Sequence, residues 1–387
     1  MRIGIVLPAT PSYSETFFNN KIKGLESCGY EVILFVNNSS SNNSSLKTVH
    51  IASGFSGNKI KSIFFSIFSI FKLVIFHFSV FKRFYLLERA DAISVFQVIK
   101  RCVLSHHILS YKLDWVHFGF GTMAIGRENV AAAIGAKMAV SFRGFDHYVY
   151  PVKNLDCYKL LFSKDVKYHV LSQEMKNDLI KLSIANDKIV KITPAINTEL
   201  FSNQSKFENK NKFLTIARLH WVKGLDYTLE ALSILDKKGI DFHYSIIGEG
   251  IEREKLLFMS HQLGLEKKVT FCGKLGQDQI KDMLNESMYY IQYSLQEGFC
   301  NATLEAQAMG KICIVSDADG LIENVVDTET GFVVQKRNPE LLAQKILEVI
   351  NLSSDEKQQI EKKANQRIIN EFSLQKQMNE FVEFYNN

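Results

Sequence analysis

The sequence predicts an α/β protein that consists of two Rossmann-like domains. The chain has 387 residues, which is too long for one ordinary domain and suits two domains of similar size. Short apolar runs alternate with helix-like stretches, as in folds whose parallel strands are connected by helices. The polar residues 202–212 interrupt this alternation, which then begins again.

The first half opens with a β-α-β pattern. Residues 3–7 predict a buried strand, residues 16–27 a helix that stops before Gly29, and residues 31–36 a second strand. The remaining elements predicted in this half are strands at 114–118, 137–142, 168–171 and 189–192, and helices at 87–111, 124–134 and 173–182.

Two polar groups follow strands of this half. Ser14 and Glu15 lie after the first strand, at the edge where α/β folds bind ligands. Ser12 and Glu15 also have the spacing of a helix capping box, so both roles remain open. A second group, which includes Arg143 and Asp146, follows the strand at 137–142.

Residues 59–87 combine many phenylalanine and isoleucine residues with a narrow polar stripe and several basic residues. Lys72 lies near the middle of the stretch, which disfavours a helix that spans a membrane. Two hypotheses remain. The stretch is either a helix that lies in the interface of an anionic membrane, or two helices buried against the first sheet.

The second half repeats the alternation of strands and helices. We predict an N-terminal domain over residues 1–201, a linker at 202–212, a second domain over 213–370, and a C-terminal helix at 371–387 that could pack back on the first domain. The elements predicted for this half are strands at 213–217, 243–247, 269–272, 289–293, 312–315 and 332–334, helices at 226–237, 251–263, 277–285, 302–309 and 340–350, and a helical region at 355–387 with a break near Phe372.

The stretch from Glu297 to Glu305 carries the strongest indication of a ligand. Gly298 would let backbone amides approach an anion at the start of a helix whose N-cap would be Asn301 and whose stop would be Gly310. The carboxylates of Glu297 and Glu305 suit the hydroxyl groups of a sugar or ribose. Alternatively, Glu305 complements the helix dipole from the first turn and Glu297 is a solvated loop residue.

Composition narrows the partners and the compartment. The net charge of +5 and the pI near 8.7 suit anionic small molecules or an anionic membrane surface better than nucleic acid. The six cysteines are scattered without a Cys-x-x-Cys pair, which favours a reducing cytoplasm over a disulfide framework or a zinc site. The apolar run at the amino terminus is too short for a signal peptide.

Several motifs of the second half occur in a fixed order: Arg218-Leu219-x3-Lys223-Gly224, Gly248-Glu249-Gly250, Phe271-Cys272-Gly273 and Glu297-Gly298-Phe299-x5-Glu305-Ala306. In this order and spacing they resemble the retaining nucleotide-sugar glycosyltransferases of the GT-B-fold family four. The first half resembles this family more loosely. Arg143-Gly144-Phe145-Asp146 stands where the family usually has His-Gly-x-Asp.

The resemblance implies the GT-B fold, with a nucleotide sugar bound in a cleft between the two domains. It also implies a role for each matching residue. Glu305 would hold the ribose hydroxyls, Arg218 and Lys223 the diphosphate, and Glu297 the sugar. Further donor-binding groups would be Gly248 and the backbone of Gly298, Phe299, Cys300 and Asn301, the catalytic residues would be Glu297, Arg143 and Asp146, and the acceptor side would carry Ser14, Glu15 and His117.

The implied activity is retaining transfer of a hexose from a UDP- or GDP-sugar to a lipid-linked bacterial surface glycan, such as a lipopolysaccharide or capsule, at the inner face of the cell membrane. No cofactor and no metal are expected, although Asp317 and Asp319 resemble the metal motif of the other transferase fold. Two alternatives remain. Arg143 motivates a catalytically silent scaffold subunit of a polysaccharide assembly complex, and the architecture is also that of a sugar-nucleotide epimerase.

Overall fold

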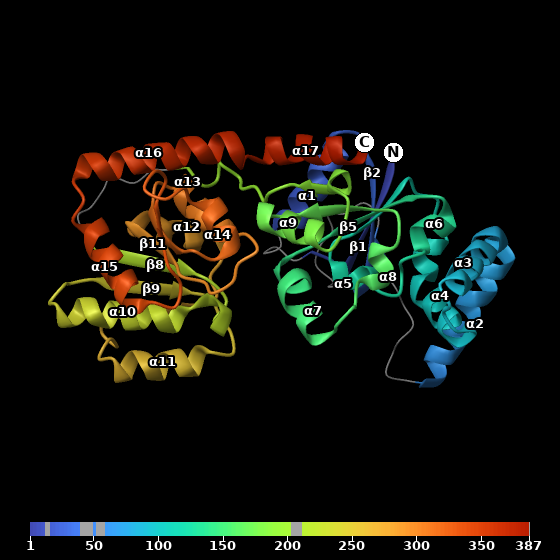
Figure 1. The fold of residues 1–387 in the computed structure, drawn as a ribbon, viewed down its shortest axis with the longest axis horizontal. Helices are drawn as coiled ribbons and strands as arrows, with labels where there is room; N and C mark the ends of the chain where they lie inside the picture. Colours follow the sequence, from blue (N-terminus) through green and yellow to red (C-terminus); the bar gives the residue numbers. More distant parts are fainter. Residues whose placement is uncertain (12–15, 39–48, 52–58, 203–210, 387) are drawn as a thin grey trace. The chain divides into compact units, whose positions relative to one another are not determined.

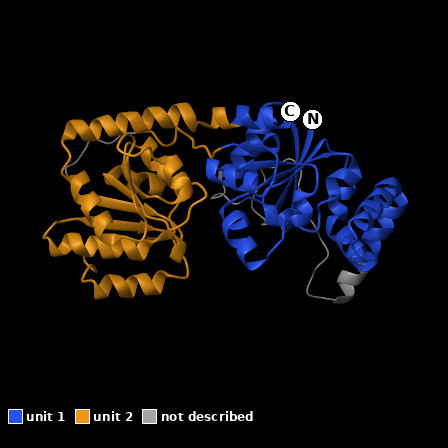
Figure 2. Ribbon diagram, in the orientation of Figure 1, with its two compact units in different colours: residues 1–192, 378–387 blue, residues 193–377 orange. Residues whose placement is uncertain are grey.

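The computed structural model describes residues 1–11, 16–38, 49–51, 59–202 and 211–386. The chain forms two compact units (Figure 2), which are Met1–Ile192 with Met378–Asn387, and Thr193–Gln377. Each unit contains a parallel sheet with helices around it (Figure 1), as the sequence predicts. Ser12, Ser14 and Glu15 lie outside the described residues, so their predicted roles stay predictions.

The first unit contains a seven-stranded sheet in the order β3-β2-β1-β4-β5-β6-β7. Strand β1 pairs with β2 on one side and β4 on the other, and its Ile3, Ile5 and Leu7 are fully buried. The strands are β1 (Arg2–Ala9), β2 (Glu31–Asn38), β3 (Val49–Ile51), β4 (Trp115–Phe118), β5 (Lys137–Ser141), β6 (Val166–Val170) and β7 (Ile189–Lys191). Its helices are α1 (Thr16–Ser27), α2 (Lys59–Phe76), α3 (Phe78–Ala90), α4 (Val95–Leu109), α5 (Gly121–Ala124), α6 (Val130–Ile134), α7 (Tyr150–Lys153), α8 (Lys159–Phe162) and α9 (Gln173–Lys181), with one π-helical turn at Phe145–Val149.

Two helices predicted as continuous are broken. The helix expected at 87–111 is divided between α3 and α4, because Ala92 has a left-handed backbone and the Ser94 hydroxyl caps α4 by accepting from the N–H of Gln97. The helix expected at 124–134 is divided between α5 and α6, with Gly126 in a left-handed conformation between them.

Residues 59–87 form two helices, as one of the two hypotheses predicts, but their packing differs from that hypothesis. The neighbours of α2 are α3 and α4, and α3 also contacts α6, so this stretch packs on other helices instead of lying directly on the sheet. Among the described residues, no helix is both long enough and apolar enough to cross a membrane.

The second unit contains a six-stranded sheet in the order β10-β9-β8-β11-β12-β13. The chain adds strands outward from β8 on one side and from β11 on the other, so the topological switch point lies between these two strands. Its strands are β8 (Lys212–Ile216), β9 (His243–Ile247), β10 (Val269–Gly273), β11 (Tyr289–Gln292), β12 (Ile312–Ser316) and β13 (Phe332–Val334). Its helices are α10 (Leu225–Lys237), α11 (Arg253–Gln262), α12 (Gln277–Glu286), α13 (Asn301–Ala308), α14 (Asp319–Asn324), α15 (Pro339–Ile350) and α16 (Ser354–Glu371), and α17 (Leu374–Asn386) follows.

The division between the units falls before the predicted linker at 202–212. Residues that precede this segment already belong to the second unit, because the Ile196 N–H donates to the carbonyl of Phe372 at 3.0 Å and the Gln377 amide donates to the carbonyl of Thr193 at 2.6 Å. The composition break therefore does not coincide with the division, because the hydrogen bonds from the Ile196 N–H and the Gln377 side chain join segments that are far apart in the sequence.

The last helix returns to the first unit, where a chain of buried polar groups anchors it. Phe381, Phe384 and Tyr385 lie in the same apolar core as β1. The Tyr385 hydroxyl lies 2.6 Å from Nδ1 of His117, and Nε2 of His117 lies 2.8 Å from Oγ of Ser141. His169 extends this chain, with Nδ1 2.7 Å from the same Ser141 oxygen.

Lys21 completes this buried network. Its Nζ lies 3.2 Å from Nδ1 of His117 and 4.2 Å from the centroid of the Phe381 ring. Burial lowers the pKa of Lys21 well below its ordinary value, with a smaller contribution from Arg143. Burial likewise lowers the pKa of His117 and of His169, and the nearby Lys21 adds to both shifts.

We expect acid to destabilise the first unit through these histidines. The unfolded chain protonates histidine near pH 6.5, whereas burial holds the folded pKa of both rings below that value, so the free energy of unfolding falls as the pH drops below about 6.5. Each histidine contributes at most about 1.4 kcal/mol per pH unit. Urea unfolding at pH 7.5 and 5.5 should show a smaller loss for His169→Gln than for the native chain. An equal loss in both proteins would contradict the assignment.

Candidate functional site

The candidate site lies at the carboxyl end of β8 and β11, on both sides of the switch point of the second sheet. The loop after β8 carries Arg218 and Lys223, and the loop after β11 carries Glu297. The structure thus brings together, from two loops that are distant in sequence, the residues predicted to bind the diphosphate and the residue predicted to bind the sugar.

Lys223 and Glu297 join these loops by an ion pair between Nζ and Oε2. Their side chains are only 14% and 13% exposed. Burial alone would lower the pKa of Lys223, but the Glu297 carboxylate outweighs it and raises that pKa above its ordinary value. The alternative that Glu297 is a solvated loop residue is therefore wrong.

Buried hydrogen bonds run from the strand to the Glu297 carboxylate. The Tyr290 hydroxyl donates to Oε1 of Gln292 at 2.8 Å, and the Gln292 amide donates to Oγ of Ser294 at 2.9 Å. Ser294 in turn donates to Oε2 of Glu297 at 3.2 Å. The carboxylate is oriented by the end of β11 as well as by its lysine partner.

Two glycines allow the loops to approach each other. Gly224 has φ +60°, and a Cβ there would lie 2.1 Å from the carbonyl oxygen of Tyr293. Gly248 has φ +138°, and a Cβ would lie 1.9 Å from the carbonyl oxygen of Ala217. For Gly248, predicted to contact the donor, the structure shows a packing role against the loop after β8.

The helix that follows the Glu297 loop begins differently from the prediction. Its N-cap is Cys300 and not Asn301, which is the first helical residue and provides no side-chain cap. The buried Asn324 side chain accepts from the Cys300 N–H at 3.0 Å and donates to the Cys300 carbonyl at 3.1 Å, and these two bonds hold the start of the helix. The predicted stop at Gly310, which has φ +71°, is confirmed.

The backbone amides of the loop are only partly available to a ligand. Because Asn324 occupies the amide of Cys300, this amide is removed from the predicted anion-binding set. The amides of Gly298, Phe299 and Asn301 donate no hydrogen bond to any residue that the structure describes. They can therefore serve a phosphate or sugar oxygen.

Helix α14, where no helix was predicted, supports this loop. The Gly320 N–H donates to the Glu297 carbonyl at 2.9 Å, and a Cβ at Gly320 would lie 2.3 Å from the carbonyl oxygen of Gly298. The Arg367 guanidinium donates to the carbonyls of Glu323 and Asn324 at 2.8 Å each. The contacts of Arg367 join distant segments of the chain, so no local sequence pattern predicts them.

The two aspartates that resemble a metal motif have protein partners. Asp319 accepts from the side-chain amide of Gln296, and Asp317 accepts from the N–H of Lys336 at 2.9 Å. Within the described part of the chain, no group of three His, Cys, Asp or Glu side chains could hold a metal ion.

Glu305 is a partly buried carboxyl group without a partner. It makes no hydrogen bond or ion pair with any residue of the described ranges, and burial raises its pKa to about 7. It is the fifth residue of α13, beyond the first turn, which argues against a role in complementing the helix dipole. A ligand with paired hydroxyl groups would supply the missing hydrogen bonds.

The Cys300 thiol is buried and unreactive, whereas the Arg218 side chain is accessible to a ligand. Burial raises the pKa of the Cys300 thiol to about 11, with a further contribution from Glu297, so this thiol is not a nucleophile at neutral pH. The Arg218 side chain is exposed and lies close enough to Lys223 to oppose its protonation. Arg218 is therefore free to meet an anion at the rim of the site.

The other predicted residues belong to the first unit. Arg143 stacks on Phe17 and Phe18, with its guanidinium carbon 4.0 and 4.5 Å from the ring centroids. Asp146 is buried, and its Oδ1 accepts from the N–H and the hydroxyl of Thr122 at 3.1 and 2.8 Å. Burial raises the pKa of Asp146 despite these bonds.

His117 does not lie in an acceptor-side loop. It is a residue of β4, fully buried, and both ring nitrogens contact protein groups. The prediction placed it by motif alone, whereas the register of the sheet directs it into the core between β1 and β5.

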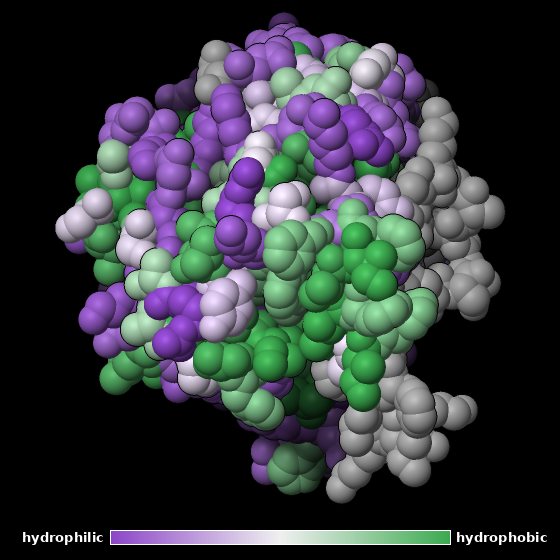
Figure 3. All heavy atoms as spheres, turned by 90° about the vertical axis from the view of Figure 1, so that its right-hand side faces the viewer, coloured by the Kyte–Doolittle hydropathy of each residue, from purple (hydrophilic) through white to green (hydrophobic). Residues whose placement is uncertain are grey.

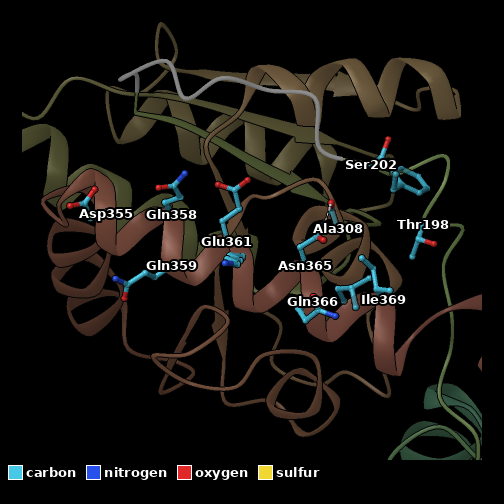
Figure 4. Close-up of a pocket in the computed structure, with 13 residues that line it drawn as sticks. Thr198, Ser202, Ala308, Asp355, Gln358, Gln359, Glu361, Asn365, Gln366 and Ile369 are labelled. Atoms are coloured by element: carbon cyan, nitrogen blue, oxygen red, sulfur yellow. Dashed lines mark hydrogen bonds between the residues drawn. The ribbon is translucent and has the colours of Figure 1, made fainter.

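A separate cavity of about 1080 Å³ lies along α16 (Figure 4). Its lining includes Thr198, Glu361 and Asn365, and it reaches Ala308 at the last turn of α13. The Glu297 loop precedes the first turn of the same helix, so this cavity is not part of the candidate site.

Part of the chain is similar to known glycosyltransferases. Residues 197–367 match the family model described as glycosyl transferases group 1. The chain is 25% identical over 269 residues to the putative colanic acid biosynthesis glycosyltransferase WcaL of Escherichia coli, covering 67% of this chain and 66% of that protein. It is 26% identical over 251 residues to the amylovoran biosynthesis glycosyltransferase AmsK of Erwinia amylovora, covering 62% and 61%. The chain thus spans less than two thirds of the length of these curated relatives.

Solved structures show the same fold over the whole chain. Anabaena HepE in complex with UDP matches with a TM-score of 0.75 at 12% identity, covering 100% of this chain and 99% of that one. A glycosyltransferase from Rickettsia africae matches with a TM-score of 0.72 at 21% identity, covering 99% and 97%. The chain has the GT-B fold.

Asn324→Ala should loosen the Glu297 loop. The substitution leaves the buried N–H of Cys300 unpaired and leaves its carbonyl only the bond from the Leu304 N–H, so we expect the free energy of unfolding to fall by about 1–3 kcal/mol. Urea unfolding measures this change, and Asn351→Ala at an exposed position is the matched control. A loss no larger than that of the control would contradict the role of Asn324.

Glu305→Gln should stabilise the chain at alkaline pH. The native carboxyl, with its pKa raised from 4.5 to about 7, favours the folded state below pH 4.5 and loses this contribution as the pH rises to about 7. The variant has no such loss, so at pH 8 its free energy of unfolding should exceed the native value by up to about 3 kcal/mol, and the difference should shrink at pH 5. Glu266→Gln, at an exposed glutamate, should show neither effect.

Proposed function

We propose that this protein transfers a sugar from a nucleotide diphosphate donor to a bacterial surface polysaccharide, because residues 197–367 match the family model of the group 1 glycosyl transferases and the chain has the GT-B fold. The relatives named for colanic acid and amylovoran biosynthesis support the class of product. HepE, whose structure was solved with UDP, favours a UDP-sugar as the donor over a GDP-sugar.

The unpartnered carboxylate of Glu305 is the observation that carries this proposal. A partly buried carboxylate without a donor among the described residues is costly, and the vicinal hydroxyls of a ribose would supply two donors to it. The free amides of Gly298 and Phe299 and the cation of Arg218 are suited to the diphosphate. Glu297, held by Lys223, is then placed to orient the hydroxyls of the sugar.

The chemistry that fits this arrangement is transfer with retention. The bond between the sugar C1 and the β-phosphate oxygen breaks, the acceptor oxygen bonds to C1 on the same face, and the acceptor proton passes to the departing nucleoside diphosphate. Glu297 is engaged by Lys223 and Ser294, which suits an orienting group better than a nucleophile. Catalysis then depends on positioning and on stabilising the charge of the leaving group.

The acceptor that we propose is a lipid-linked glycan, which places the enzyme at the inner face of the cell membrane. No metal is required in this scheme, because the leaving charge is met by Arg218, Lys223 and backbone amides. The transferred sugar is proposed to be a hexose.

A calorimetric panel of UDP, GDP, CMP and uridine tests the donor site. Arg218→Ala should weaken UDP binding about tenfold and leave uridine binding unchanged, because only the diphosphate is affected. Glu305→Ala should weaken both ligands by about tenfold or more, because both contain the ribose. Arg253→Ala and Glu266→Ala are the matched controls at surface positions.

Unchanged UDP affinity in both variants would refute the assignment of the site. Where UDP binds as expected, turnover of UDP-sugar with and without a glycan acceptor separates the activities. Acceptor-dependent release of UDP supports a transferase, and release without an acceptor indicates a hydrolase. Conversion of the UDP-sugar to its epimer without release of UDP indicates an epimerase, and neither release nor conversion indicates a scaffold.

A further inference from the structure

Helix α2 exposes the side that most helices bury. Phe68, Phe71 and Phe76 are 64%, 60% and 71% exposed, whereas the buried side, which faces α3 and α4, includes Ser69 and Leu73 at 2% and 1%. A surface helix of a soluble protein normally has the opposite arrangement. The amphipathic pattern of α2 is therefore inverted over its described side chains.

These exposed side chains form one surface, which we call the phenylalanine face and define as Ile67, Phe68, Phe71, Ile75 and Phe76 of α2 with Phe78 of α3. Figure 3 looks onto this end of the first unit and shows a hydrophobic area bordered by hydrophilic residues. Single exposed apolar residues are normal, but a continuous group of large ones marks a site of interaction.

The charges around the phenylalanine face have one sign. Lys72, Lys82 and Arg83 are exposed and form no ion pair with a described residue. The two acidic residues of this region are already neutralised. Glu88 is fully buried and bonded to Arg101 at 2.9 Å, and Asp91 is paired with Lys164 at 2.5 Å.

We propose that the phenylalanine face binds the interface of an anionic lipid bilayer. The phenylalanine rings enter the boundary between headgroups and acyl chains, and the surrounding cations contact lipid phosphates. A second copy of this chain fits less well, because a twofold contact would bring Lys72, Lys82 and Arg83 near their own copies without any exposed carboxylate to meet them. The inference rests on the proposed function for the lipid-linked acceptor, but the binding itself does not require transferase activity.

Flotation with vesicles of phosphatidylcholine, with or without 30% phosphatidylglycerol, tests this face. The native chain should float with the anionic vesicles, and 0.5 M salt should weaken this binding. The double variant Phe68→Ser, Phe71→Ser should bind at least tenfold more weakly, and Lys72→Glu about fivefold or more. Because these side chains are exposed, the variants should fold, which a thermal unfolding midpoint within a few degrees of the native value would verify.

Two matched variants control for composition. Phe258→Ser removes a phenylalanine that is 62% exposed on α11 of the other unit, and Lys238→Glu reverses an exposed charge there. Both should float like the native chain. Equal flotation of the native chain and the double variant would overturn the proposal, and so would a native dimer that dissociates in the double variant while flotation stays unchanged.

Calorimetry with UDP keeps this result separate from the proposed function. The double variant should retain native UDP affinity, because the phenylalanine face belongs to the first unit and Glu305 to the second. Loss of flotation with intact UDP binding supports the membrane surface. A native chain that floats but binds no nucleotide would refute the proposed function and leave this inference standing.

Discussion

The ion pair between Lys223 and Glu297 is the interaction on which the candidate site depends. Two charges that are largely withdrawn from water are tolerable only together, so the loops that carry them must stay in contact. Gly224 makes this contact possible, because a side chain there would collide with the backbone before the Glu297 loop. Gln292 and Ser294 then orient the carboxylate from inside the strand. The same contacts therefore hold together the loops that follow β8 and β11 and position the polar groups of the site.

Glu305, unlike Glu297, has no oppositely charged partner among the described residues. Its carboxyl group lies in the same unit, is partly buried and finds no partner among the described residues, which raises its pKa and costs stability. The surrounding frame keeps it in this state. The Asn324 side chain holds the start of α13 and the Arg367 side chain holds α14, each by hydrogen bonds to the backbone. Helix α13 therefore cannot easily shift to give the Glu305 carboxylate a partner within the protein. A carboxyl group that lacks hydrogen bonds at a cost in stability is expected where a ligand supplies those bonds.

The first unit departs twice from the usual distribution of polar and apolar groups, and the two departures differ in kind. Lys21 is buried, but His117 and the ring of Phe381 surround its amine, so the unit itself accommodates this group. Phe68 and Phe71 are exposed, and no described part of the chain covers them. The first departure is resolved by internal contacts that tie the last helix to the sheet. The bilayer interface proposed above would resolve the second.

The sequence by itself determined the two α/β units and most elements of the second, because hydrophobic periodicity and glycine stops are local properties. The strand at His243–Ile247 has the predicted bounds, and parallel strands place Lys223 and Glu297 at one edge by topology alone. Only the tertiary structure decided that Asn324 occupies the amide of Cys300, that Glu305 has no partner among the described residues, and that the described side chains of α2 are inverted. Each of these facts depends on which side chains meet across elements far apart in the chain, and no local pattern encodes such meetings.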